Sequence, residues 1–205
     1  MDQETLFGFI QALVFVGFVA HRGYYNRKFP GSEADTLERQ RPGVSTRIAN
    51  LLAIPALFGL VAYLISPASM SWASMTLPAW SRWGGVGLAG MGFALLQWSH
   101  VALGKNWSDH PRITTTQTLV TDGPYRRIRH PIYTSFILIL GSSLYISANW
   151  FIGLLWIIAT AVDIEARIRF EEENMAARFG EEYRRYKART GSLLPASDRS
   201  RRMRG

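Results

Sequence analysis

Residues 123–162 read GPYRRIRHPIYTSFILILGSSLYISANWFIGLLWIIATAV, a stretch that joins a cluster of cations to a long uncharged run. From Pro131 to Val162 the sequence has no Asp, Glu, Lys or Arg. A helix needs about 20 apolar residues to cross the hydrocarbon core of a membrane. The run is too long for one upright crossing, and Ser147-Ala148-Asn149 is typical of a turn. We therefore predict two membrane helices that form a hairpin.

Three earlier stretches, residues 5–21, 48–65 and 84–103, are also long and apolar enough to cross a membrane. The third is rich in glycine, and small residues let membrane helices approach closely. The sequence therefore predicts an all-α, polytopic membrane protein with about five transmembrane helices. It contains no cysteine, which excludes disulfides and thiolate metal sites.

The distribution of positive charge predicts how the chain is oriented in the membrane. All of the 23 Lys and Arg residues except Arg82 lie in segments that five crossings would place on one side. Lys and Arg gather in cytoplasmic loops, so we expect the N-terminus outside and the C-terminus in the cytoplasm. A cytoplasmic face against anionic lipid also accounts for the net charge of +8. Membrane lipid is thus the expected partner, and nucleic acid is not.

Residues 162–189 predict a different kind of helix. Apolar side chains recur on one face of a 3.6-residue period, and the other faces are charged. We expect this amphipathic helix to leave the membrane and lie against its cytoplasmic face, with a bend or break at Gly180. The chain then divides into a three-span region (1–103), a core with a loop, a hairpin and the amphipathic helix (104–195), and a disordered basic tail (196–205).

Several polar residues at the predicted membrane surface could carry chemistry. His130 lies between Arg129 and Pro131, at the start of a predicted helix. On the amphipathic helix Arg167 precedes three consecutive carboxylates, residues 171–173, of which at least one should face inward. An inward carboxylate suits a cationic ligand, and an inward Arg suits an anionic one. Charge alone leaves open whether these segments form a pocket or are ordinary connections. A metal site is not expected, because the histidines lack further ligands.

These residues resemble the isoprenylcysteine carboxyl methyltransferase family, and phospholipid N-methyltransferases look similar. The resemblance covers residues 104–195. It is carried by the following elements, in order: Gly-Pro-Tyr at 123–125, Arg-His-Pro-Ile-Tyr at 129–133, Glu-Glu at 171–172, Phe-Gly-Glu-Glu-Tyr at 179–183, Tyr186 and Leu194-Pro195.

The resemblance implies S-adenosylmethionine as methyl donor, bound at the cytoplasmic face. It implies the following donor-binding residues: His110, Gln117, Thr118, Leu119, Val120, Tyr125, His130, Pro131, Ile132, Tyr133 and Glu171. Arg167 would bind a carboxylate acceptor. If the acceptor must lose a proton, Glu172 or Tyr133 is the nearest candidate base.

We therefore expect an integral membrane methyltransferase that acts on a lipophilic small molecule or a prenylated acceptor, with the carboxylate of an isoprenylcysteine-like compound favoured. One alternative is a phospholipid amine N-methyltransferase. Another is an NADPH-dependent enzyme similar to membrane sterol reductases, which carry a related Arg-His-Pro stretch. A membrane scaffold without activity is a third. The sequence does not indicate the oligomeric state.

Overall fold

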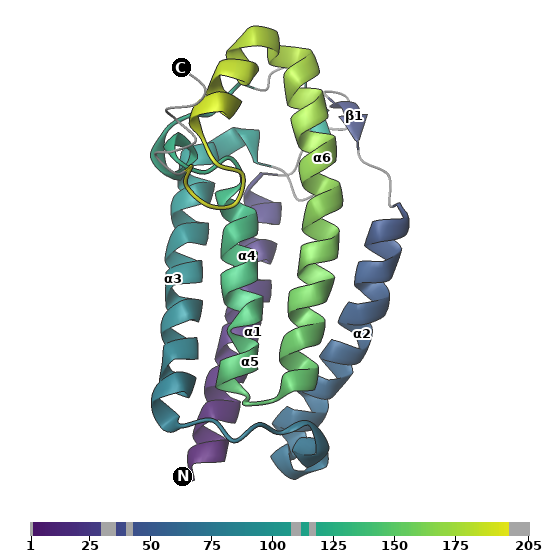
Figure 1. The fold of residues 1–205 in the computed structure, drawn as a ribbon, viewed down its shortest axis with the longest axis vertical. Helices are drawn as coiled ribbons and strands as arrows, with labels where there is room; N and C mark the ends of the chain where they lie inside the picture. Colours follow the sequence, from purple (N-terminus) through teal and green to yellow (C-terminus); the bar gives the residue numbers. More distant parts are fainter. Residues whose placement is uncertain (1, 30–35, 40–42, 108–111, 115–117, 197–205) are drawn as a thin grey trace.

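The computed structural model describes residues 2–29, 36–39, 43–107, 112–114 and 118–196. Its long helices stand side by side along the longest axis of the molecule, and the start of α1 lies at the opposite end from the yellow, C-terminal part of α6 (Figure 1). The helices are α1 (Gln3–Lys28), α2 (Val44–Ile65), α3 (Ala79–Leu103), α4 (Pro131–Gly141), α5 (Ser143–Ile146) and α6 (Trp150–Arg189). Short 3-10 turns connect them: η1 (Pro67–Ala73), η2 (Gly104–Asn106) and η3 (Gly123–Arg126).

Three helical stretches, Gln3–Lys28, Val44–Ile65 and Ala79–Asn106, are long and apolar enough to cross a membrane. Pro131–Ile146 is a shorter apolar helix. Large apolar side chains such as Phe9, Leu51 and Phe58 are exposed on the outside of the bundle. Apolar outer faces of this extent would be unstable in water and suit a lipid environment. The chain is thus built as a multi-pass integral membrane protein.

The predicted hairpin is confirmed. Helix α5 ends at Ile146 and α6 begins at Trp150, and Ala148 between them has a positive φ of 46°. Asn149 caps α6, because its side-chain oxygen accepts a hydrogen bond from the backbone N–H of Ile152 at 3.1 Å. A Cβ atom on Gly153 would lie 2.4 Å from the Cα of Leu144, so only glycine lets the two arms of the hairpin pack this closely.

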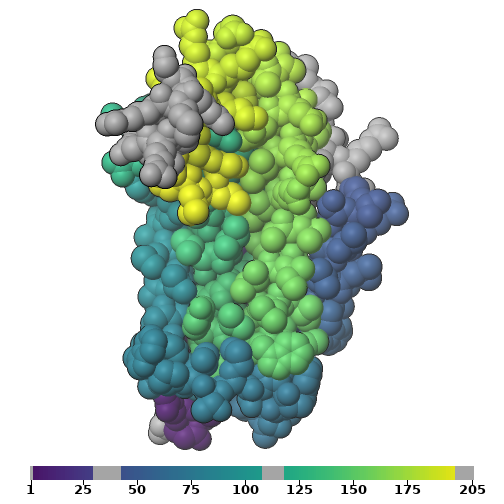
Figure 2. All heavy atoms as spheres, in the orientation of Figure 1, coloured from purple at the N-terminus to yellow at the C-terminus, as the bar shows by residue number. Residues whose placement is uncertain are grey.

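The last helix differs from the prediction. The amphipathic segment does not form a separate helix but continues α6, which runs for 40 residues. Between Gly153 and Gly180 the sequence has neither Gly nor Pro to end the helix. The predicted bend at Gly180 is confirmed, since this residue has a positive φ of 52° and the chain beyond it folds back toward the bundle (Figure 1). Figure 2 shows the returning segment, in yellow, lying against the green end of α4.

The all-α prediction is confirmed for the architecture, and the described residues contain in addition one small sheet that the sequence did not predict. Strand β1 (Thr36–Arg39) pairs antiparallel with β2 (Arg112–Thr114), and the register shifts between Thr36 and Glu38. The two strands belong to connections that leave α1 and α3 at the same end of the bundle. Their backbones pair there, and segments of four and three residues carry too little periodicity to be recognised in the sequence.

Two of the five glycines of α3, Gly85 and Gly92, have the predicted packing role, whereas an added Cβ on any of the other three would have nothing within 4 Å. A Cβ atom on Gly92 would lie 2.6 Å from Cγ1 of Ile139 on α4, and one on Gly85 would lie 2.7 Å from Cβ of Tyr145 on α5. Helix α3 therefore contacts the hairpin almost backbone to backbone. This contact holds the start of α4, which carries His130, in a fixed position at the end of the bundle.

Candidate functional site

The segment before α4 is held by backbone pairing with the end of the chain. The N–H of Arg129 donates to the carbonyl of Gly191 at 2.8 Å, and the N–H of His130 donates to the carbonyl of Ser192 at 3.0 Å. In return the N–H of Gly191 donates to the carbonyl of Arg127 at 3.2 Å. The chain after α6 thus fixes the backbone of the segment that leads from Arg127 to His130.

A cluster of charged side chains surrounds Glu172. Its carboxylate contacts Nε of Arg129 at 2.7 Å, Nζ of Lys187 at 2.6 Å and Nε2 of His130 at 3.2 Å. Burial alone would favour the neutral carboxyl. The hydrogen bonds from His130, Lys187 and Arg129 outweigh it and hold the pKa of Glu172 well below its ordinary value. Glu172 is therefore an ionised residue that joins α6 both to residues 129–131, the RHP segment, and to Lys187 beyond the bend at Gly180.

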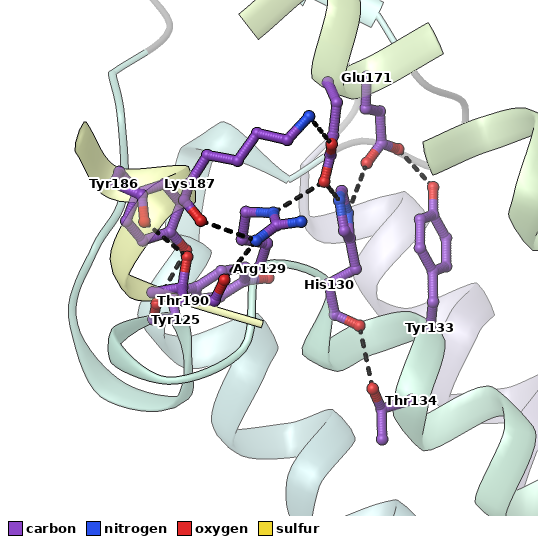
Figure 3. Close-up of polar contacts among 10 residues, drawn as sticks. Tyr125, Arg129, His130, Tyr133, Thr134, Glu171, Tyr186, Lys187 and Thr190 are labelled. Atoms are coloured by element: carbon purple, nitrogen blue, oxygen red, sulfur yellow. Dashed lines mark hydrogen bonds and ion pairs between the residues drawn. The ribbon is translucent and has the colours of Figure 1, made fainter. Parts of the chain in front are cut away.

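His130 lies between two carboxylates (Figure 3). Its Nδ1 is 3.2 Å from Oε2 of Glu171, and its Nε2 is 3.2 Å from Oε1 of Glu172. Ionised carboxylates only accept hydrogen bonds, so both ring nitrogens must donate and the imidazole is positively charged. Burial opposes this charge, but the hydrogen bonds to Glu171 and Glu172 prevail and raise the pKa of His130.

Glu171 has a second partner in the hydroxyl of Tyr133, which donates to its Oε1. Tyr125 is positioned by Tyr186, whose hydroxyl donates to the Tyr125 carbonyl at 2.8 Å. Burial raises the pKa of Tyr125, as does the nearby charge of Glu171. Helix α6 thus contributes a carboxylate, and α4 and η3 contribute one aromatic ring each, to the same site.

These side chains border a cavity of about 420 Å³. One end is polar and carries Tyr125, His130 and Glu171. The other lies among helices and is lined by apolar or small side chains, including Phe18 of α1, Ala53 of α2 and Phe136 of α4. A cavity of this volume can hold a small organic molecule. Because its lining changes from polar to apolar, it can bind a polar group at one end and an apolar group at the other.

One face of α6 runs along the whole cavity. Its lining residues are Trp156, Ala159, Thr160, Asp163, Ile164, Arg167, Glu171 and Met175. The spacing of three or four residues keeps them on one side of the helix. Arg167 and Asp163 form an ion pair within this face, with Nε 2.6 Å from Oδ2.

The structure brings together most of the residues predicted for the site. The cavity is lined by Thr118, Leu119, Val120, Tyr125, His130, Ile132, Tyr133, Arg167 and Glu171. Pro131 and Glu172 do not line it. Pro131 is the first residue of α4, and Glu172 binds Nε2 of His130. Glu173 is exposed. His110 and Gln117 lie outside the described residues.

Sequence reasoning missed two groups of lining residues. The first comes from the opening helices and includes Arg22, Ala49 and Asn50. Nothing in their local pattern distinguishes them from other residues of membrane helices. The second is Asp163, which the period of α6 could have revealed, because it lies one turn before Arg167 and two before Glu171. Among the described residues no group of three or more His, Cys, Asp or Glu side chains could hold a metal ion.

Comparison with known proteins gives three matches. Residues 85–177 match the model of the isoprenylcysteine carboxyl methyltransferase (ICMT) family. The chain is 37% identical over 71 residues to methanethiol S-methyltransferase 1 of Bradyrhizobium diazoefficiens, which covers 35% of this chain and 24% of that protein. It is 30% identical over 97 residues to protein-S-isoprenylcysteine O-methyltransferase of Schizosaccharomyces pombe, covering 47% of this chain and 38% of that one. The matches thus span well under half the length of these relatives.

Proposed function

Because residues 85–177 match the model of the isoprenylcysteine carboxyl methyltransferase family, we propose that the chain transfers a methyl group from S-adenosylmethionine to an acceptor with an apolar body. The observation that carries the proposal is the single cavity that joins the polar cluster of His130, Tyr133 and Glu171 to a pocket among the helices. A charged donor and a greasy acceptor could meet there. Both relatives named above are methyltransferases by name, which agrees with this reaction.

The residues at the polar end fit the methyl donor. Glu171 is a carboxylate that faces the cavity, and a carboxylate attracts the ammonium and sulfonium groups of S-adenosylmethionine. The rings of Tyr125 and Tyr133 line the same end, and aromatic faces also attract cations. Thr118, Leu119 and Val120 border it with backbone groups and small side chains. The bound donor would supply an electrophilic methyl group attached to a positively charged sulfur.

Alignment and exclusion of water are then the main tasks of the protein. Phe136, Leu140 and Trp156 line the deeper part of the cavity and provide an apolar wall for the acceptor. A carboxylate acceptor needs no base, and Arg167 is placed to attract it. We therefore assign Arg167 to acceptor binding and take the carboxylate of an isoprenylcysteine-like compound as the first acceptor to test.

Tyr133 and Glu172 receive different roles in this proposal. Tyr133 lines the cavity and hydrogen-bonds Glu171, so it can touch both reactants. Glu172 is bound by three cations and does not line the cavity. A carboxylate with a lowered pKa is a weak base, so Glu172 acts by holding His130 and not by accepting a proton.

We further propose five membrane crossings, with the apolar helix Pro131–Ile146 and the uncharged first part of α6 as the last two. The cavity then opens at the cytoplasmic face, where the positive charges of the chain are concentrated. The N-terminus would lie outside and the C-terminus inside. A lipophilic acceptor could reach the apolar end from the bilayer.

The test is incubation of the purified chain with a tritium-labelled methyl donor and a total lipid extract, followed by identification of the labelled compound. Label in a methyl ester of a lipophilic acid supports the favoured acceptor. Label in a phospholipid headgroup supports the amine alternative. If no compound is labelled, even with a synthetic farnesylcysteine derivative added, the proposed reaction is wrong.

A further inference from the structure

The apolar end of the cavity is closed by packed side chains. Its lining ends at the following residues, one on each of four helices: Phe18 of α1, Ala53 of α2, Leu140 of α4 and Trp156 of α6. One turn farther from the polar end, Ala56, Ser143 and Ile152 do not line the cavity and are 0%, 2% and 0% exposed. Side chains packed this closely leave no room for a ligand. The cavity therefore has a floor, and a bound molecule cannot extend along the bundle past it.

Trp156 is the largest side chain at this floor. Its ring lies against that of Phe15 on α1, with the ring centroids 5.9 Å apart. Both rings pack on a cluster of buried residues, which are Leu60, Tyr63, Met70 and Ile152. Because close-packed cores yield little, Trp156 cannot swing aside without disturbing α1 and α2. Its indole ring is therefore a fixed stop.

The distance from the acceptor head group to this floor follows from α6. The side chain of Arg167, which the proposed function assigns to the acceptor carboxylate, reaches back one turn to Asp163, with Nε 2.6 Å from Oδ2. Trp156 lies seven residues before Asp163, which is about 10 Å along the helix. An extended chain advances about 1.2 Å per bond, so about eight bonds span this distance. The room thus fits an acid whose main chain has about nine atoms, counted from the carboxyl carbon.

We propose that Trp156 limits the length of the acceptor tail, so that the site prefers acids with a short apolar body; this inference rests on the proposed function. A cysteine thioether with one isoprene unit has a main chain of about eight atoms, close to this limit. Each further unit adds about four bonds, or roughly 5 Å. Tails with two or three units must fold back within the cavity or displace packed side chains, and both are unfavourable.

The test measures kcat/KM for N-acetylcysteine thioethers with dimethylallyl, geranyl and farnesyl tails, which have one, two and three isoprene units. They are presented in detergent micelles with labelled donor. Since a micelle is as apolar as the cavity, a longer tail gains nothing by leaving it. We expect the wild type to use the dimethylallyl compound at least about tenfold better than the farnesyl compound. Equal or better use of the farnesyl compound would overturn the inference and leave the proposed function standing. If none of the three is methylated, the proposed function fails and the inference with it.

Trp156→Ala removes the indole ring and moves the floor to Ile152, four residues or about 6 Å farther along α6. Because this is close to the length of one isoprene unit, the variant should prefer the geranyl compound. The matched control is Trp150→Ala, since Trp150 is on the same helix, is 41% exposed and does not line the cavity. The control should keep the wild-type order of acceptors. A Trp156→Ala variant that also keeps this order would overturn the assignment, and the wild-type series decides the matter if the variant does not fold.

Binding without turnover gives a second measurement. Bromine quenches tryptophan fluorescence on contact, so acids with a bromine at the end of the tail report what the tail touches. An acid with about nine main-chain atoms should quench the wild type more strongly than Trp156→Phe, which lacks the indole at the floor. Equal quenching of the two proteins would show that the tail does not reach Trp156 and would overturn the inference.

Discussion

Replacing Glu171 by Gln should weaken donor binding strongly while leaving the fold intact. Gln has the same shape and can still accept the hydrogen bond from Tyr133, so the change removes charge and little else. Two unit charges about 4 Å apart interact by roughly 4 kcal/mol at an effective dielectric constant of about 20. The side chain of Glu171 is 28% exposed, and His130 shares its charge, so the loss should be smaller. We expect about 1.4 to 2.8 kcal/mol, a 10- to 100-fold decrease in affinity.

Calorimetric titration with two ligands identifies which positively charged group of the donor Glu171 contacts. S-adenosylmethionine and S-adenosylhomocysteine both carry an ammonium group, but only the first carries a sulfonium. Equal losses for the two ligands would assign Glu171 to the ammonium, and a larger loss for S-adenosylmethionine would assign it to the sulfonium. Glu173→Gln is the matched control, because Glu173 is an exposed carboxylate two positions along the same helix. The reasoning is refuted if the Glu171 variant binds both ligands as tightly as the control does.

Three further predictions concern stability. Glu172→Gln breaks a largely buried ion cluster. This should lower the free energy of unfolding by about 3 kcal/mol or more, and the Tm in a thermal melt by roughly 6 °C or more. An unchanged Tm would show that the cluster does not stabilise the fold. The pKa of Glu172 is lowered from 4.5 and that of His130 is raised from 6.5, so their contribution to stability should be greatest between about pH 4.5 and 6.5. It should decline on acidification as Glu172 is protonated and on alkalinisation as His130 loses its proton; a Tm measured against pH that shows no maximum in this window contradicts the assignment. Gly92→Val should destabilise the contact between α3 and α4 by about 1 to 3 kcal/mol, whereas Gly90→Val, where an added Cβ has nothing within 4 Å, should have little effect on the Tm.

The sequence contains enough information to predict most of the helices. Apolar runs predict the long helices because crossing a membrane demands a length that few other structures need. The hairpin turn at Ala148 and the break at Gly180 were also predictable, since small residues and glycine mark such positions. The continuity of α6 was not, because a change from an apolar to an amphipathic pattern suggests two helices although the backbone needs no break between them.

The residues that line the cavity could be grouped from the sequence where they form contiguous motifs. Tyr125, His130 and Tyr133 belong to one short segment, and the position of that segment before an uncharged helix already indicated a membrane-surface site. The choice among the carboxylates at 171–173 could not be made from the sequence, because it depends on how α6 is rotated. The structure resolves it: Glu171 lines the cavity, Glu172 holds His130, and Glu173 is exposed.

The lining residues from α1 and α2 could not be predicted from the sequence for a different reason. Arg22, Ala49 and Asn50 are brought to the cavity only by helix packing, and residues 85–177, which match the family, do not include them. Side chains in this part of the cavity lie beside its apolar end. We therefore expect the first two helices to contribute to the choice of acceptor and the matched region to carry donor binding.

The proposed reaction requires that the cavity between the RHP segment and α6 binds a positively charged sulfur compound. Calorimetric titration of the purified wild-type chain with S-adenosylmethionine and, separately, with NADPH measures this binding. We expect saturable heat of binding with S-adenosylmethionine and none with NADPH. Saturable binding of NADPH, or binding of neither compound, would contradict it.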